Sequence, residues 1–169
     1  MPPTRLLPLR PHRAHDQDMT APTPDSLPLP FTPPWAAALC AEIEGDAAYR
    51  EASHGWRWPL ALVLDRAPDL GFPNDVAVQL KLDRGRCLGA DVRPASKVDA
   101  TFALRAPYAI WKRVVRGELD PVIGVMKGEV KLTGSIGTLM MHTRSAKALV
   151  ECARRVPIRF PDEERTAGA

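Results

Sequence analysis

The sequence has few cysteines and lacks a long hydrophobic run. Its three cysteines, Cys40, Cys87 and Cys152, lie far apart and form no C-x-x-C pair. An odd and sparse set is poor material for a disulfide framework, so the sequence predicts free thiols in a reducing compartment, the cytoplasm. The longest apolar stretch, from Trp58 to Leu64, is far too short to cross a bilayer, which excludes stable membrane insertion.

The sequence also lacks a large excess of positive or negative charge. The chain has 23 lysines and arginines against 20 aspartates and glutamates, for a net charge of +3. These charges are interspersed, without the long basic stripe that phosphate binding favours, so no nucleic-acid partner is expected. Hydrophobic residues make up 45% and charged residues 25% of the 169 residues, which is typical of one ordinary globular domain with tails.

Motifs for catalysis and for metal or cofactor binding are missing as well. There is no G-x-S-x-G, H-E-x-x-H, Walker or C-x-x-C pattern. Gly128, Gly134 and Gly137 do not have the spacing of a dinucleotide fingerprint. His142 has no cysteine or carboxylate at metal-ligand spacing. We therefore expect no enzyme activity, no cofactor and no metal.

The distribution of proline indicates where the domain begins and ends. Residues 1–33 are rich in proline and lack a periodic apolar pattern, which predicts a disordered tail. Met19 within it is a candidate for the true translation start. The folded domain is expected over 34–157, and the small and polar residues of 158–169 predict a second loose tail.

Periodicity predicts the elements of this domain. Apolar residues at helical spacing, from Trp35 on, predict a helix over 35–52. Strict alternation from Asp75 to Leu82, then Asp83-Arg84-Gly85-Arg86, predicts a β-hairpin. The remaining predicted strands are 58–65, 87–92, 100–104 and 129–133. The remaining predicted helices are a short one from Pro107 to Gly117, another from Asp120 to Gly128, and a long one over 135–155. The predicted strands have one polar face, and several helices are predicted beside them. Together these elements favour a two-layer α+β domain, with a largely antiparallel sheet covered by helices on one face.

Three segments in the second half of the chain form a distinctive set: Ala100-Thr-Phe-Ala-Leu104, Gly117-Glu-Leu-Asp-Pro121, and the run MKGEVKLTGSIGTLM from Met126 to Met140. In these segments the chain resembles the sterol carrier protein type two family. The resemblance covers about residues 35–156. It implies a mixed five-stranded sheet with helices over one face and an apolar cavity between the layers. The ligands that it implies are fatty acids, acyl-CoAs, sterol-like molecules and phospholipids.

Methionines gather in this half, and their flexible, polarisable side chains suit irregular apolar ligands. Together with nearby apolar residues they form the predicted ligand site, although ordinary core packing is an equally good interpretation. The predicted site consists of Trp111, Val115, Ile123, Met126, Met140, Met141 and Leu149. The functional hypothesis is non-catalytic binding, with possible transfer, of a lipid. The alternative is a structural or protein-interaction module whose interior has filled in.

Overall fold

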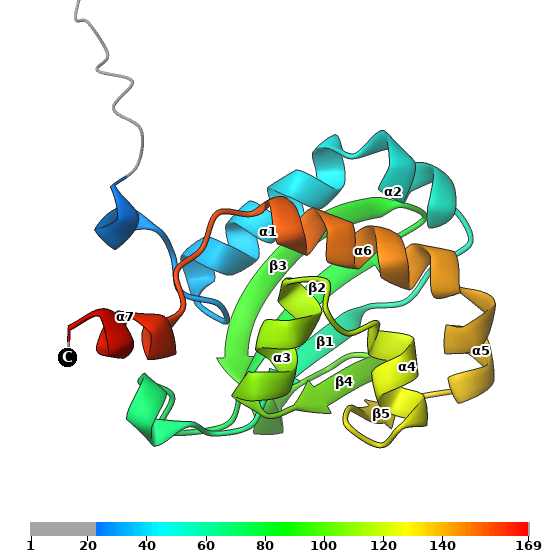
Figure 1. Cartoon of the computed structure of the whole chain (residues 1–169). Helices are drawn as coiled ribbons and strands as arrows, with labels where there is room; N and C mark the ends of the chain where they lie inside the picture. Colours follow the sequence, from blue (N-terminus) through cyan, green and yellow to red (C-terminus); the bar gives the residue numbers. More distant parts are fainter. Residues whose placement is uncertain (1–22, 169) are drawn as a thin grey trace, which may run out of the picture.

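A computed structural model describes residues 23–168 as one sheet covered by helices. The strands are β1 (Leu60–Leu64), β2 (Val76–Asp83), β3 (Arg86–Pro94), β4 (Phe102–Ala106) and β5 (Lys131–Thr133). The helices are α1 (Pro33–Gly45), α2 (Ala47–Ala52), α3 (Tyr108–Val115), α4 (Pro121–Met126), α5 (Ile136–Met141), α6 (Thr143–Arg155) and α7 (Pro161–Ala167), with 3-10 turns at Pro24–Ser26, Pro68–Leu70 and Ala95–Lys97. Helices α1, α3 and α6 lie across one face of the sheet (Figure 1).

The sheet is mixed, with the strand order β3-β2-β1-β4-β5. Strands β1 and β4 run parallel, while β1–β2, β2–β3 and β4–β5 are antiparallel pairs. This confirms the predicted α+β class, the two layers and the five-stranded, largely antiparallel sheet.

The face of the sheet away from the helices is partly covered too. All five residues of β1 are buried, whereas one-sided cover would leave alternate residues exposed. Ala61, Val63 and Ala77 form a small apolar cluster there, and the segment 95–100 packs against it. The backbone N–H of Asp99 donates to Gln79 Oε1 at 2.9 Å and holds this segment in place.

The β2–β3 hairpin has the turn that its sequence predicts. Arg84 and Gly85 both have positive φ, 50° and 81°, as a two-residue type I′ connection requires. The tip of the hairpin also packs against the backbone of α2, because a Cβ on Gly85 would lie 2.6 Å from the carbonyl oxygen of Arg50.

Gly85→Ala is expected to lower the free energy of unfolding by about 1–3 kcal/mol, because both the φ angle and the Arg50 backbone oppose a side chain. Gly89→Ala is the matched control, since a Cβ there meets only Lys81 Cδ, at 3.7 Å. Urea unfolding of the two variants measures the difference. Equal stability of the two variants would contradict this account of the turn.

Two predicted long helices are each divided in the structure. The predicted helix 35–52 breaks at Asp46, whose Oδ1 accepts from the backbone N–H of Tyr49 at 2.6 Å and caps α2. The predicted helix 135–155 breaks at His142, which is not helical. The His142 ring packs edge-on against Trp56 and Trp58, with centroids 5.4 and 5.7 Å away. These aromatic contacts accompany the change of direction between α5 and α6.

The packed region extends beyond the expected 34–157 at its N-terminal side. Phe31 is buried and its ring lies 5.3 Å from that of Trp35 and 5.5 Å from that of Trp111. The apolar side chain of Phe31 therefore belongs to the core. The remainder of the expected tail, 1–22, and the candidate start Met19 lie outside the described residues.

The C-terminal side differs from the expected loose tail in the same way. Phe160 is buried, and Lys112 Nζ lies 5.0 Å from the centroid of its ring. Helix α7 follows, and Asp162 accepts hydrogen bonds from Tyr108 Oη at 2.7 Å and from Lys112 Nζ at 2.6 Å. An aromatic anchor and a half-buried ion pair thus attach this segment to α3.

The prediction of three free thiols is wrong for two of them. Cys40 on α1 and Cys87 on β3 form a disulfide with a Cα–Cα distance of 5.5 Å. The two residues are 47 positions apart, and α1 packs along β3, a contact that spacing alone does not predict. Cys152 is free and buried, and burial is the main cause that raises the pKa of its thiol to about 11.

Candidate functional site

A small apolar void lies between the sheet and the helices, with a volume of about 60 Å³. Leu60 and Leu62 of β1 form its floor together with Leu104 of β4 and Leu82 of β2, because period two turns alternate strand residues to the helical face. Residues at helical spacing on α1 and α6 form its roof. The lining comprises Trp35, Leu39, Tyr49, Trp56, Leu60, Leu62, Leu82, Leu104, Trp111, Val114, Val115, Pro121, Leu139, His142, Ser145, Ala146, Leu149, Val150 and Ala153.

The lining contains no aspartate, glutamate, lysine or arginine. The Ser145 hydroxyl is already hydrogen-bonded to that of Ser53, at 2.5 Å between the oxygens. Burial raises the pKa of Tyr49 to about 12, so its phenol is neutral at physiological pH. The void therefore suits uncharged groups.

One polar atom in this lining has no partner. Trp111 Nε1 donates to the carbonyl oxygen of Val63 at 2.8 Å, and Trp56 Nε1 donates to that of Trp58 at 2.7 Å. Trp35 is 1% exposed, and its Nε1 has no hydrogen-bond acceptor within the described part of the chain. A buried donor left unsatisfied costs about 1–3 kcal/mol, which an added acceptor oxygen would recover.

The void is much smaller than a lipid. An apolar cavity of about 150 Å³ takes up one benzene molecule, whereas this void measures about 60 Å³. The indole rings of Trp35, Trp56 and Trp111 occupy much of the space between the layers. An alkyl chain therefore requires a shift of the surrounding side chains or helices.

The structure separates the predicted site residues into two groups. Trp111, Val115 and Leu149 line the void. The other four are exposed on α4 and α5 and do not line it: Ile123, Met126, Met140 and Met141. A role of the first three in ligand binding stays a prediction.

Two helical patterns in the sequence carry information about these positions that the prediction did not use. Trp35 and Leu39, at i and i+4 on α1, both face the void. Met140, in contrast, is four and seven positions before Arg144 and Lys147, which are exposed. In a continuous helix over 135–155 this spacing would place Met140 on the solvated face, whereas in the structure Met140 is exposed on α5, before the break at His142.

A second and larger groove, of about 820 Å³, opens beside the ends of β2 and β3. Arg105 in its wall binds Asp65 and Asp75 at 2.6 and 2.5 Å. Hydrogen bonds from the Arg66 N–H and from Arg105 hold the pKa of Asp75 below its usual value. Two carboxylates thus bind the one guanidinium, so Arg105 is not free to bind an anionic ligand in this groove.

Two other features are absent from residues 23–168, a metal-binding cluster and a membrane-spanning helix. No group of three or more histidines, cysteines, aspartates or glutamates within this range is placed to hold a metal ion. No helix in the same range is long and apolar enough to cross a membrane.

Comparison with known proteins gives structural matches. No protein-family model and no curated protein matches the chain. A crystal structure described as sterol carrier protein 2 is 38% identical, has a TM-score of 0.72, and covers 75% of this chain and 98% of its own. A Thermus thermophilus protein, described as possibly a sterol carrier protein, is 37% identical with a TM-score of 0.72, over 76% of this chain and 90% of its own.

A third structure, of the sterol carrier protein domain 2 of Helicoverpa armigera, shares 14% identity over 81% of this chain and 97% of its own. Its TM-score is 0.50, so it supports the fold alone. The arrangement of the sheet and the helices agrees with all three structures, and the identity of the first two extends over nearly their whole length. The chain belongs to the sterol carrier protein 2 family.

Proposed function

We propose that the protein binds, and passes on, a neutral lipid that carries a hydrogen-bond acceptor, and that it does so without catalysis. The observation that carries this proposal is the void between sheet and helices, which is apolar, has no aspartate, glutamate, lysine or arginine in its lining, and is lined in part by Trp35, whose buried Nε1 has no acceptor in the described part of the chain. Membership of the sterol carrier protein 2 family supports it.

The chemistry of the lining favours a neutral head group. A carboxylate buried there would lose its hydration and find no lysine or arginine to replace it. The charged ends of a fatty acid, an acyl-CoA or a phospholipid would therefore stay outside, with only the chain buried. Once the void has enlarged, a sterol-like molecule or a long-chain alcohol can be enclosed entirely, with its oxygen as the acceptor for Trp35 Nε1.

Ligand uptake requires the void to enlarge, and α4 and α5 are the best candidates for the moving part. Each helix has only six residues and contributes one residue to the lining of the void, Pro121 from α4 and Leu139 from α5. Short helices have few backbone hydrogen bonds to resist a shift. An outward displacement of either helix would enlarge the void and widen its access to the solvent.

The expected affinity is moderate and the selectivity for chain length low. A dozen buried methylenes contribute about 10 kcal/mol, at about 0.8 kcal/mol each. Lost freedom of motion on association opposes this by about 4–15 kcal/mol. At the low end of that cost about 6 kcal/mol remains, which corresponds to a Kd of roughly tens of micromolar, and one methylene more or less changes this Kd only about fourfold.

A non-catalytic role agrees with the state of the potential nucleophiles. Burial raises the pKa of the Cys152 thiol and of the Tyr49 phenol to about 11 and about 12, so neither is ionised at neutral pH. The Ser145 hydroxyl pairs with Ser53 and not with a base. These groups are suited to packing, and they lack the activation that a nucleophile needs.

Native mass spectrometry of the gently purified protein tests the proposal. A retained neutral lipid is the expected result. The specific observation that favours the alternative, a structural or interaction module, is the small volume of the void. An empty chain that co-purifies with a stable protein partner, and that takes up no decanol, would favour that alternative.

Trp35→Phe is expected to weaken the binding of decanol about fivefold, since it removes a hydrogen bond of about 1 kcal/mol. The binding of decane, which has no acceptor, should be unchanged. Displacement of a fluorescent lipid analogue by each compound measures both affinities. Trp58→Phe, which makes the same chemical change outside the lining, is the control, and equal losses for decanol and decane would contradict the role of Trp35 Nε1.

A further inference from the structure

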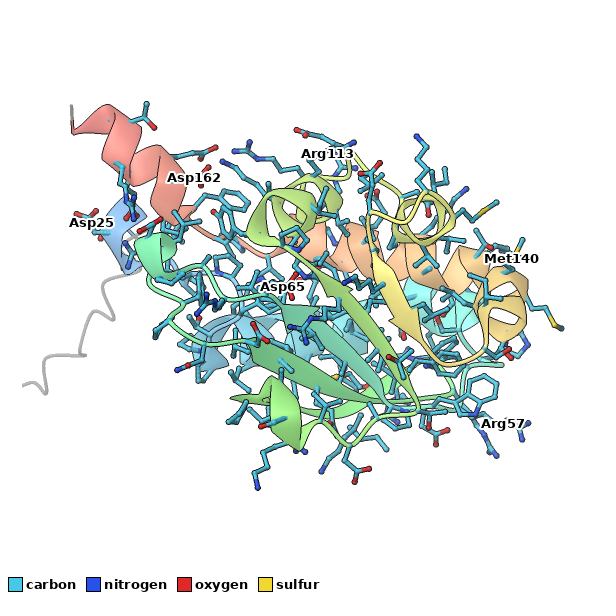
Figure 2. All side chains as sticks on the ribbon, turned by 90° about the horizontal axis from the view of Figure 1, so that it is seen from below. Asp25, Arg57, Asp65, Arg113, Met140 and Asp162 are labelled. Atoms are coloured by element: carbon cyan, nitrogen blue, oxygen red, sulfur yellow. A yellow bond between two sulfur atoms is a disulfide. The ribbon has the colours of Figure 1, made fainter. Side chains whose placement is uncertain are left out.

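Helices α4 and α5 carry the largest group of exposed apolar side chains near the end of the sheet formed by β5. The two helices lie next to each other in both views (Figures 1 and 2), and Figure 2 labels Met140 on their outer side. We call the group the α4–α5 patch. It consists of Ile123 (46% exposed), Met126 (65%), Ile136 (44%), Met140 (49%) and Met141 (85%).

The patch lies on the outer side of helices whose inner residues reach the void. Pro121 of α4 and Leu139 of α5 line the void, while the patch residues of the same helices face solvent. Exposed methionines in such number are unusual for a surface without a partner, since flexible apolar side chains contribute most when they are covered.

Positive charges border the patch. Lys127 directly follows α4, and Arg144 and Lys147 occupy the first two turns of α6, after α5. Arg57 lies at the same end of the molecule (Figure 2). All four are exposed, and none takes part in a salt bridge within the described chain.

The acidic residues of this region do not offset these charges. Asp120 lies at the start of α4, at the end opposite Lys127, where its carboxylate accepts from the backbone N–H of Val122 at 2.8 Å. Glu129 binds Arg113 at 2.9 Å. Glu118 is exposed but precedes α4, at the end opposite Lys127. The border of the patch is therefore positive on the side where the methionines lie.

We propose that the α4–α5 patch docks onto a membrane surface that contains anionic lipid. Apolar side chains that enter the head-group boundary and cations that meet lipid phosphates or carboxylates act together in such docking. A second copy of the chain fits less well, because a twofold contact through this patch would bring the same cations together. The surface is independent of the void, but it would place α4 and α5, and through them the proposed lipid site, against a source of lipid.

Sedimentation of the full chain with vesicles tests this proposal. Binding is expected to vesicles of phosphatidylcholine with phosphatidylserine, and about tenfold weaker binding to phosphatidylcholine alone. Met140→Ser with Met141→Ser should reduce binding to the mixed vesicles about tenfold, and so should Lys127→Glu with Arg144→Glu. Leu88→Ser is the control, because Leu88 is 63% exposed on β3, at the opposite edge of the sheet.

Each result decides for or against the patch. Wild-type levels of binding by both double variants, or no binding by the wild type, would overturn the proposal. A dimer in sedimentation-velocity runs that is lost in the methionine variant would assign the patch to a second copy instead. Decanol binding by the methionine variant separates the two proposals, since it should persist whether or not the membrane contact exists.

Discussion

Leu149→Trp is expected to abolish the uptake of an alkyl ligand, with an affinity at least about a hundredfold lower. Leu149 projects from α6 into the lining of a void that measures only about 60 Å³. An indole ring there would occupy the space that several methylenes need, and the loss of four of them corresponds to about 3 kcal/mol. Displacement of a fluorescent lipid analogue by decanol gives the affinity, and circular dichroism verifies that the fold is kept.

Met140→Trp is the matched control for this experiment. It introduces the same ring on α5, but Met140 is exposed and does not line the void, so decanol binding should stay within about twofold of the wild type, the scale of an exposed substitution of about 0.5 kcal/mol. The opposite outcome, in which Met140→Trp blocks uptake and Leu149→Trp does not, would place the ligand on the outer surface of α4 and α5. The proposed position of the site would then be wrong.

Replacing both Cys40 and Cys87 by serine is expected to lower the free energy of unfolding by about 4 kcal/mol. The disulfide joins residues 47 positions apart, and closing a loop of that length reduces the entropy of the unfolded chain by roughly this amount. Urea unfolding of the oxidised protein, of the reduced protein and of the double variant measures it. Reduction should lower the stability of the wild type to that of the variant.

Cys152→Ser is the control, because Cys152 is free, and its variant should still lose stability on reduction. A wild-type protein whose stability does not respond to reductant would contradict the pairing of Cys40 with Cys87. The Cys40–Cys87 disulfide is also relevant to the cellular location of the protein, since disulfides are rare in the cytosol of most organisms. The expected cytoplasmic location stays a prediction, which alkylation of free thiols in intact cells would test.

The sequence predicts the sheet better than the helices. The alternation of Val76 to Leu82 and the Arg84-Gly85 turn define a hairpin that the structure confirms. The helix breaks at Asp46 and His142 were not predicted, because they depend on contacts between segments. The His142 ring packs against Trp56 and Trp58. Local helix propensity does not predict this contact between distant segments.

The candidate site was predictable only in part for a similar reason. Helical periodicity gives the core faces of α3 and α6, on which Trp111 and Leu149 line the void, and their role in ligand binding stays a prediction. Met126 and Met141 are exposed and lie outside the lining of the void, because apolar character does not ensure burial in short helices, where a few residues define no clear face. The Cys40–Cys87 disulfide and the unpaired Nε1–H of Trp35 depend on how distant segments pack together. The local sequence pattern therefore does not predict them.

The indole N–H signals of the four tryptophans test the central claim most directly. In a 1H–15N spectrum recorded during titration with decanol, the Trp35 signal should move downfield as its Nε1 gains an acceptor. The signals of Trp56 and Trp111, which already donate to carbonyl oxygens, should change less. A Trp35 signal that stays in place at saturating decanol would contradict the account of a lipid held between the sheet and the helices.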